Sequence, residues 1–320
     1  MTYTGDPTDA HAAAIVADLY GLRPKAVRRF GTGNQHFVFE AVLTDRRTVV
    51  VRLSRAADVD IARGAVFWSR RLRPLGVPLP KLLHADLDMR TWPFPFIVLD
   101  RLPGTDLGNV YPDLTVRQRR DLACRLVEIQ RIVTAQPEGT GFGFSRSDKG
   151  PFSAQSWPDV IAVDLERHRV RIRAAGLVDE QKVDAVERWA DRLTDYLAAV
   201  RPTPFLHDIT TKNVIVDRGG LSGIVDVDDL CFGDPLFLLA LIRIALLAHD
   251  RDPAYIDDWL SLLRPDNDEL AALDFYTAVH CVGFMGELGH RFNRSKPDPM
   301  NASFFSRLNR LHETLCSTLQ

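Results

Sequence analysis

The segment from Phe205 to Pro235 reads FLHDITTKNVIVDRGGLSGIVDVDDLCFGDP and says the most about the fold. Its middle predicts a β-hairpin, with one strand on either side of the adjacent residues Gly219 and Gly220. A Gly-Gly loop tolerates the positive φ angles that a type I′ turn requires. With these two glycines as the loop, Asn213 pairs with Asp226. We therefore expect an amide oxygen and a carboxylate to meet at the open end of the hairpin.

A second carboxylate, Asp208, lies just before the predicted hairpin, on the loop that enters its first strand. Oxygen ligands suit Mg²⁺, which typically takes one or two carboxylates and leaves its other positions to water and phosphate. The pattern therefore predicts a site for phosphate chemistry. The structural alternative is a polar loop with Asx-type turns, followed by the acidic end of a strand.

The bulk composition is that of an ordinary globular protein. The 320 residues suffice for one large domain or two smaller ones, and 46% of them are hydrophobic and 26% charged. A formal net charge of −2 gives no reason to expect a nucleic acid or an acidic membrane surface as a partner.

Targeting signals are not recognisable in the sequence. The N-terminal segment lacks a basic stretch followed by an apolar one, so secretion is not expected. The most apolar run, Pro235–Ala248, is too short to span a bilayer and contains Arg243, so it predicts a buried helix. The four cysteines are far apart and lack a metal-binding spacing. We expect a cytoplasmic protein without a membrane partner.

The pattern of apolar residues changes near residue 102. Strand-like runs with one helical stretch precede it, and spacings of three and four typical of helices follow it. This predicts an α+β fold with a small β-rich N-terminal lobe, residues 1–101, and a larger mainly helical lobe, residues 102–320. A ligand is expected between the two lobes. The expected strands are 27–30, 37–43, 48–53 and 96–100, and the expected helices are 59–75, 116–133, 160–173, 182–200, 236–248, 255–263, 269–288 and 304–319.

Three motifs in one order carry a resemblance to a known family. They are Asp208-Ile-Thr-Thr-Lys-Asn213, Ile224-Val225-Asp226-Val227-Asp228 and Gly233-Asp234-Pro235. In this order and spacing they resemble the catalytic loop, the metal-binding segment and the following Gly-Asp-Pro of the aminoglycoside phosphotransferase and choline kinase-like family. These enzymes are relatives of the protein kinases. The resemblance covers nearly the whole chain and implies a protein-kinase-like two-lobe fold.

The resemblance also implies roles for the residues of these motifs. Asp208 would accept or orient the proton of the attacking substrate hydroxyl. Asn213 and Asp226 would hold Mg²⁺ against the nucleotide phosphates. Asp228 lies two residues beyond Asp226, on the same face of a continuing strand, and is a further candidate for a metal ligand or a water contact.

The N-terminal part resembles the nucleotide-binding lobe of the same family. The loop Phe30–His36 resembles the phosphate-covering loop, where glycines let backbone N–H groups approach phosphate oxygens. The segment Phe94–Gly104 resembles the strand and hinge over which the purine lies. The candidate nucleotide-binding residues are therefore Gly31, Thr32, Gly33, Asn34, Arg52, Asp100 and Leu102.

Two features depart from the family pattern. Arg52 stands where kinases have a phosphate-binding lysine, and arginine can bind phosphate bidentately. The helical stretch after it carries no carboxylate where the partner Glu is expected, so the usual Lys–Glu ion pair is absent or rebuilt. The family commonly has His two residues before the catalytic Asp. Here that position is Leu206 and the histidine is His207, which leaves the hydrogen bonding of the loop open.

The acceptor of relatives binds against the C-terminal helices, which makes Asp229, Trp157 and Glu287 the substrate candidates. The resemblance implies a Mg²⁺-dependent kinase that moves the γ-phosphate of ATP or GTP to a hydroxyl of a small molecule, such as an antibiotic or a sugar-containing metabolite. The alternative is a pseudokinase that binds nucleotide without turnover. A protein kinase is disfavoured, because no activation segment ending in Ala-Pro-Glu is recognisable.

Overall fold

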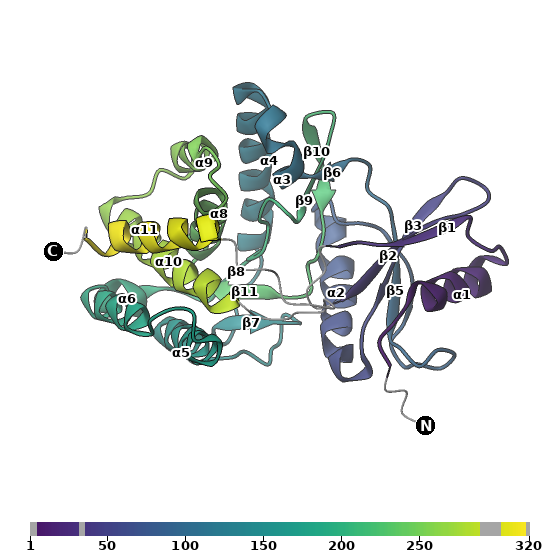
Figure 1. Cartoon of the computed structure of the whole chain (residues 1–320), viewed down its shortest axis with the longest axis horizontal. Coiled ribbons are helices and arrows are strands. Elements are labelled where there is room, and N and C mark those ends of the chain that lie inside the picture. Colours follow the sequence, from purple (N-terminus) through teal and green to yellow (C-terminus); the bar gives the residue numbers. More distant parts are fainter. Residues whose placement is uncertain (1–4, 32–35, 289–301, 318–320) are drawn as a thin grey trace.

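The computed structural model describes residues 5–31, 36–288 and 302–317. Within this part of the chain, a β-sheet lies at one end and most of the helices lie at the other (Figure 1). Helix α2, Val59–Leu72, and a β-hairpin lie between the two ends. The expected α+β fold, with strands toward the N-terminus and helices toward the C-terminus, is thus confirmed.

The N-terminal sheet has five antiparallel strands in the order β1-β2-β3-β5-β4. The sequence pattern missed β4, because its residues are mostly exposed or half-buried and show no apolar alternation. The strands are β1, Ala26–Arg29; β2, Phe37–Val42; β3, Thr48–Leu53; β4, Leu82–Asp86; and β5, Phe96–Asp100.

The alternation of side chains gives this sheet two different faces. Phe39 and Val51 lie on one face, in a buried cluster with residues of helix α1, Asp9–Tyr20. Arg52 follows Val51 and therefore points to the other face. Its partner across the ladder, Ile97, packs in the cluster of helix α2. Strand alternation thus directs the buried cation Arg52 toward the rest of the molecule.

Two three-stranded sheets follow the N-terminal sheet in the chain. The first has the order β10-β9-β6 and contains the hairpin, and the second has the order β7-β11-β8. Their strands are β6, Thr105–Asp106; β7, Gly143–Ser145; β8, Thr203–Phe205; β9, Val214–Asp217; β10, Gly220–Ile224; and β11, Leu230–Gly233.

The hairpin forms where it was expected, but its turn lies one residue earlier. The two central residues are Arg218 and Gly219, with φ of 51° and 82°, as a type I′ turn requires. A register shift between Leu221 and Gly223 then changes the pairing. The predicted pairing of Asn213 with Asp226 is therefore wrong, because the backbone N–H of Val225 donates to the carbonyl of Asn213 at 2.9 Å. Asp226 is the residue that follows.

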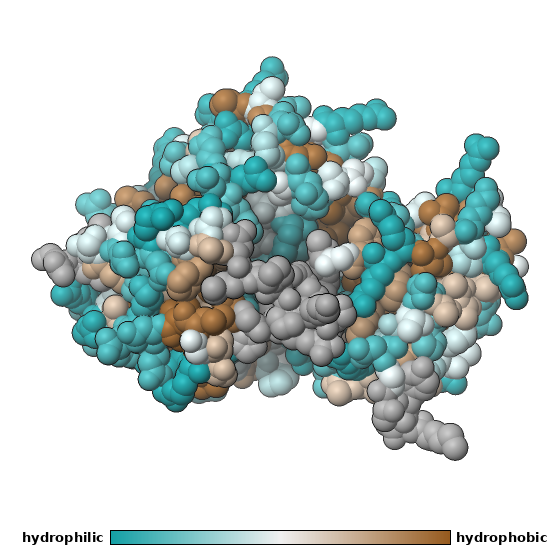
Figure 2. All heavy atoms as spheres, viewed as in Figure 1, coloured by the Kyte–Doolittle hydropathy of each residue, from teal (hydrophilic) through white to brown (hydrophobic). Residues whose placement is uncertain are grey.

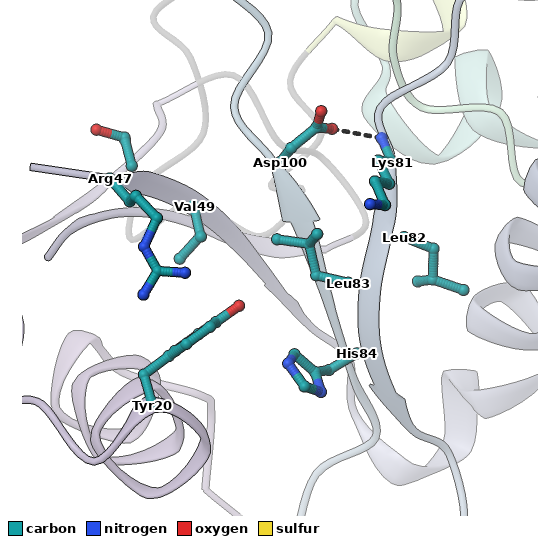
Figure 3. Close-up of a pocket in the computed structure, with 9 residues that line it drawn as sticks. Tyr20, Arg47, Val49, Lys81, Leu82, Leu83, His84 and Asp100 are labelled. Carbon is teal, nitrogen blue, oxygen red and sulfur yellow. Dashed lines mark hydrogen bonds between the residues drawn. The ribbon is translucent and has the colours of Figure 1, made fainter. Parts of the chain in front are cut away.

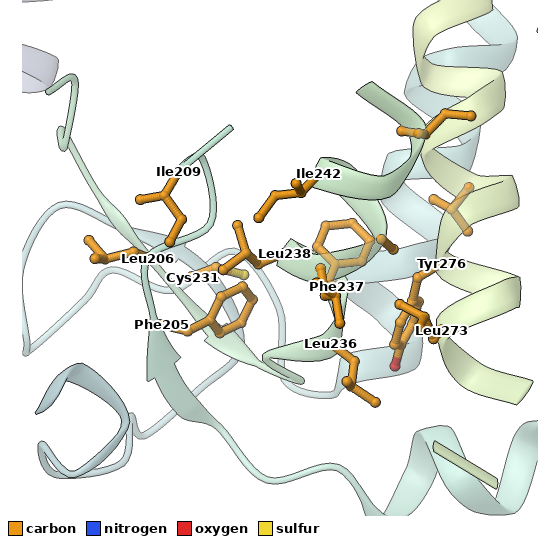
Figure 4. Packing of buried hydrophobic residues seen from close by; sticks show 14 of the residues in the cluster. Phe205, Leu206, Ile209, Cys231, Leu236, Phe237, Leu238, Ile242, Leu273 and Tyr276 are labelled. Carbon is orange, nitrogen blue, oxygen red and sulfur yellow. The ribbon is translucent and has the colours of Figure 1, made fainter. Parts of the chain in front are cut away.

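The helical part is built around two apolar helices. Helix α8, Leu236–Ala248, has the predicted bounds and packs against α10, Asn267–Glu287. Figure 4 shows Phe237 and Ile242 of α8 in one cluster with Tyr276 of α10. The other helices are α3, Leu107–Val110; α4, Val116–Thr134; α5, Trp157–Ala175; α6, Gln181–Arg192; α7, Thr194–Ala199; α9, Ala254–Leu263; and α11, Ala302–Ser317.

The same cluster reaches the loop that follows β8. Leu206 and Ile209, on either side of the candidate base, are buried in it (Figure 4). On the face drawn in Figure 2, hydrophilic residues predominate and hydrophobic ones gather only in small groups. Among the described residues, no helix is long and apolar enough to cross a membrane.

Candidate active site

The loop between β8 and β9 presents the carboxylate of Asp208. The side-chain Nδ2 of Asn213 donates to the Asp208 carbonyl at 2.8 Å, which closes the loop. The hydroxyl of Thr210 donates to Oδ1 of Asp208 at 3.0 Å, and Nζ of Lys212 lies 3.6 Å from Oδ2. The Asp208 side chain is 28% accessible, so its carboxylate is held by these contacts and is still reachable from outside.

The backbone of Leu206, which stands where the family commonly has His, is bound by a side chain from another element. Gln130 of α4 is buried, and its Nε2 donates to the carbonyl of Leu206 at 2.7 Å. Its Oε1 accepts from the backbone N–H of the same residue at 3.1 Å. Both backbone groups of Leu206 are therefore satisfied by one side chain, two residues before Asp208. The sequence had no signal for Gln130, since a glutamine on a helix is ordinary.

The neighbouring His207 takes a different position from the histidine expected in the loop. Its ring packs against Phe144 with the ring centroids 4.7 Å apart. Its Nδ1 lies 3.4 Å from Oδ1 of Asp229, close enough for an ion pair but without hydrogen-bond geometry. Burial raises the pKa of Asp229, and the nearby His207 opposes this rise. Of the three substrate candidates, Asp229 is the one that contacts the catalytic loop.

In the segment Ile224–Asp228, which resembles the metal-binding segment of the family, Asp226 has a left-handed backbone with φ of 65°. This conformation is uncommon for residues other than glycine and often marks functional sites. The Asp226 side chain remains 46% accessible. The adjacent Asn213 is buried and uses its Nδ2 to bind Asp208, which leaves its amide oxygen as the group able to bind a metal.

These two residues fit a magnesium ion. Both present oxygen, which Mg²⁺ prefers, and Mg²⁺ usually keeps few protein ligands because phosphates and water fill its shell. Among the described residues, no group of three or more His, Cys, Asp or Glu side chains could hold a metal by itself. The site is thus suited to an ion that arrives with a phosphate ligand.

Arg52 reaches this segment from the N-terminal sheet. Its Nη2 lies 2.7 Å from Oδ2 of Asp228 and 3.2 Å from Oδ1 of Asp226. The same Oδ2 of Asp228 accepts from Nε2 of His36 at 2.9 Å, and Nδ1 of His36 lies 2.9 Å from Oγ of Ser54. The expected lysine–glutamate pair is therefore rebuilt as an arginine–aspartate contact. His36 belongs to the quoted loop but was not predicted to take part.

The charges of this cluster follow from burial and proximity. Burial alone would lower the pKa of Arg52, but Asp228 and Asp226 raise it above its ordinary value. Burial would raise the pKa of Asp228, yet Arg52 and the hydrogen bond from His36 hold it below its usual range. Asp228 is therefore firmly ionised beside Arg52.

The other predicted nucleotide-binding residues lie around the sheet. Gly31 is exposed at the end of the first strand, and Thr32, Gly33 and Asn34 fall outside the described residues. Asp100 ends β5, and its backbone N–H donates to the carbonyl of Lys81 at 3.0 Å. The carbonyl of Leu102 accepts from the guanidinium of Arg101. The structure thus places Arg52 with the metal-binding segment and Asp100 at the edge of the N-terminal sheet.

A cavity of about 450 Å³ lies on the face of the N-terminal sheet opposite to the one from which Arg52 points (Figure 3). Tyr20 of α1, Val49 of β3 and His84 of β4 line it, together with Asp100. Val49 and Arg52 are three positions apart on one strand and therefore point to opposite faces. The cavity is separate from the cluster around Arg52.

The other two substrate candidates, Trp157 and Glu287, do not lie in the cluster around Arg52. Trp157 is 1% exposed, and its Nε1 donates to the hydroxyl of Tyr276 at 2.8 Å. Its ring also packs edge-on against Phe237, so the prediction that it contacts substrate is wrong: it is a core residue. The sequence pattern could not distinguish a buried tryptophan from an exposed one at a helix start. Glu287 is exposed at the C-terminal end of α10.

Comparison with solved structures identifies the fold. The chain is similar to a thermostable mutant of aminoglycoside phosphotransferase APH(4)-Ia, solved with AMP-PNP and hygromycin B, with a TM-score of 0.65 and 17% identity over 96% of this chain and 97% of that one. It is also similar to aminoglycoside 2'-phosphotransferase-IIIa in its GDP complex, with a TM-score of 0.68 and 14% identity over 98% and 100% of the two chains.

A third similar structure is the amicoumacin kinase hAmiN in complex with AMP-PNP, Ca²⁺ and Ami. Its TM-score is 0.67, with 14% identity over 98% of this chain and 94% of that one. At these identities the likeness establishes a shared, protein-kinase-like fold. The model of the phosphotransferase enzyme family matches residues 26–276, which include the catalytic loop, the metal-binding segment and Arg52. The chain therefore belongs to the phosphotransferase enzyme family.

Proposed function

We propose that this protein is a Mg²⁺-dependent kinase that transfers the γ-phosphate of ATP or GTP to a hydroxyl of a small molecule. The observation that supports this most directly is the meeting of Arg52 from the sheet with Asp226 beside the catalytic loop. A cation and an oxygen-rich site thus come together from distant parts of the sequence. Phosphoryl transfer depends mainly on such positioning and charge neutralisation.

Each residue of the site has a proposed task. Asp208 accepts or orients the proton of the substrate hydroxyl, while Thr210 and Lys212 keep its carboxylate in place. Asn213 and Asp226 hold Mg²⁺, which when bound neutralises phosphate charge. Arg52 and the loop that begins at Gly31 contact the phosphates. The loop residues assigned to this task by resemblance are Thr32, Gly33 and Asn34.

Two backbone positions are proposed to bind the purine. Asp100 is the last residue of β5 and Leu102 follows two residues later, where the family resemblance puts the hinge. The division of the chain at residues 101 and 102 stays a prediction, as does a cytoplasmic location.

The proposed acceptor is a hydroxylated antibiotic or a sugar-containing metabolite. The solved structures with the same fold were obtained with hygromycin B and with amicoumacin, which supports this class without selecting a member. Asp229 is the proposed acceptor contact beside the base, because it lies against His207 of the catalytic loop. Glu287 stays a weaker substrate candidate at the end of α10.

The test is a screen of hydroxylated antibiotics and sugar-containing metabolites with ATP and with GTP. Each reaction is read by mass spectrometry as the gain of one phosphate. We expect at least one acceptor to gain phosphate with the wild type and none to do so with Asp208→Asn. The matched control is Asp217→Asn, a carboxylate at the far end of β9 from Asp208, which should leave turnover unchanged.

A second candidate function is nucleotide binding without turnover. It is favoured by the departures from the family pattern, which are Arg52 in place of the lysine, the helix without a partner Glu, and Leu206 in place of the histidine. Binding of Mg-nucleotide with no phosphate gain across a broad panel would support it. Turnover that persists in Asp208→Asn would contradict the assignment of Asp208 as the base.

A further inference from the structure

The carboxylate of Asp228 lies closer to Arg52 and is less accessible than the carboxylate of Asp226. We propose that Asp228, assisted by His36, is the positioning residue that holds Arg52 for the nucleotide phosphates, and that it is not a ligand of Mg²⁺. This inference rests on the proposed function. It assigns to a residue of the metal-binding segment the part that a helix glutamate has in the resembled kinases.

The first argument is the accessibility of the two carboxylates. The Asp228 side chain is 12% accessible, whereas that of Asp226 is 46% accessible. Oδ2 of Asp228 already accepts from both Arg52 and His36. Its Oδ1 is buried and has no hydrogen-bond partner among the described residues, so a hydrated ion has no open path to it. Asp226 is therefore the carboxylate that remains available to a metal.

The second argument is that the buried cation Arg52 needs a counter-ion. Arg52 is 7% exposed, and a buried guanidinium without a counter-ion is strongly unfavourable. Asp228 is its closer partner, at 2.7 Å against 3.2 Å for Asp226. Asp228 therefore supplies the closer counter-charge that holds Arg52 in place beside the metal-binding segment.

The third argument comes from helix α2, where the partner glutamate was expected. Gly64 packs so closely on the metal-binding segment that a Cβ there would lie 2.1 Å from the carbonyl oxygen of Asp228. Any side chain at this helix position is therefore excluded by the backbone of the residue that supplies the carboxylate. Helix α2 can therefore carry no side chain at position 64 while the backbone of Asp228 lies this close to it.

The fourth argument is the continuity of the hydrogen bonds. Ser54, His36, Asp228 and Arg52 form a chain that starts directly after β3, passes the residue before β2 and the metal-binding segment, and returns to β3. His36 is the last residue of the loop Phe30–His36 that resembles the phosphate-covering loop. The same contacts that orient Arg52 therefore tie this loop and the sheet to the metal-binding segment.

The test measures binding of mant-ATP, a fluorescent nucleotide, at a series of Mg²⁺ concentrations. We expect Asp228→Asn to weaken nucleotide binding by at least about tenfold, because a hydrogen-bonded charge pair is broken, with the Mg²⁺ concentration for half-saturation unchanged. Asp226→Asn should instead raise that Mg²⁺ concentration. Combining Arg52→Gln with Asp228→Asn should cost little more than Arg52→Gln alone, because the two residues act together.

Two further variants guard against a change in folding. His36→Gln should weaken binding by less, with the same unchanged Mg²⁺ dependence. Gly64→Ala should weaken binding without altering any charge, whereas Gly286→Ala in α10 is its control, since a Cβ there meets its nearest atom at an ordinary 3.4 Å. Far-ultraviolet circular dichroism checks the fold of each variant.

Two results would overturn the inference while leaving the proposed function intact. One is an Asp228→Asn protein whose Mg²⁺ requirement rises as in Asp226→Asn, which would make Asp228 a metal ligand. The other is an Asp228→Asn protein that binds mant-ATP like the wild type. A wild type that binds no Mg-nucleotide would overturn the inference and the proposed function together.

Discussion

The substitution Gln130→Leu removes the only side chain that binds both backbone groups of Leu206 among the described residues. Gln130 is 6% exposed and Leu206 is 1% exposed, so water cannot easily replace the two lost bonds. A buried polar group left without a partner costs roughly 1–3 kcal/mol. With two such groups, and some relaxation, we expect a loss of about 3 kcal/mol in the free energy of unfolding.

This loss translates into a measurable shift of the unfolding temperature. At an unfolding entropy of about 2 cal/mol/K per residue, a chain of 320 residues should unfold about 4 °C lower. Because Asp208 lies two residues beyond Leu206, the loop should also hold its carboxylate less well. We therefore expect kcat for an accepted substrate to fall by about tenfold or more, with a smaller change in KM.

Differential scanning fluorimetry and steady-state kinetics measure the two effects. The control is Gln136→Leu, two residues past the end of the same helix, where the half-buried side chain donates to the Ile132 carbonyl at 3.2 Å. That variant should leave both quantities nearly unchanged. If Gln130→Leu matches the wild type in unfolding temperature and kcat, the role of Gln130 in holding the Leu206 backbone is refuted.

Three other predictions follow from the structure. Trp157→Ala should lower the free energy of unfolding by about 3–5 kcal/mol in urea titrations, because it empties a core position, whereas Glu287→Ala should leave it unchanged. Burial lowers the pKa of His280 to about 4, so the folded protein keeps this ring neutral where the unfolded chain, with the ordinary pKa of 6.5, already binds a proton. The free energy of unfolding is therefore highest above pH 6.5 and falls as the pH falls from 6.5 toward 4. Between pH 7.5 and 5 this should cost about 2 kcal/mol, and a His280→Gln protein with the same pH dependence would contradict the assignment. Asp226→Ala should abolish the Mg²⁺-dependent part of the thermal stabilisation by nucleotide, which reaches about 2.7 kcal/mol in the wild type at 100 times Kd, and equal stabilisation of the two proteins would count against Asp226 as a metal ligand.

Local patterns sufficed for much of the architecture. The apolar run of α8 predicted its bounds, because a helix buried on all sides needs apolar residues throughout. Strand β4 escaped the prediction because most of its residues are not buried and its pairing is decided by β5. The hairpin turn lies at Arg218-Gly219, and the register irregularity in β10 makes up only part of that shift, so Asn213 does not pair with Asp226. No local sequence pattern predicts such an irregularity.

The sequence by itself determined the order and type of the chemical groups: Asp208, Asn213 and Asp226 on one hairpin frame, with Arg52 on a strand far ahead of them. These groups are close in the chain or belong to recognisable motifs, so their spacing limits where they can lie. Only the tertiary structure decided which partners they have. Asp228 meets Arg52 across 176 positions of sequence, and Gln130 meets Leu206 across 76. Such contacts depend on how α2 and α4 pack, and Gly64 and Gln130 reveal their roles only once their neighbours are in place.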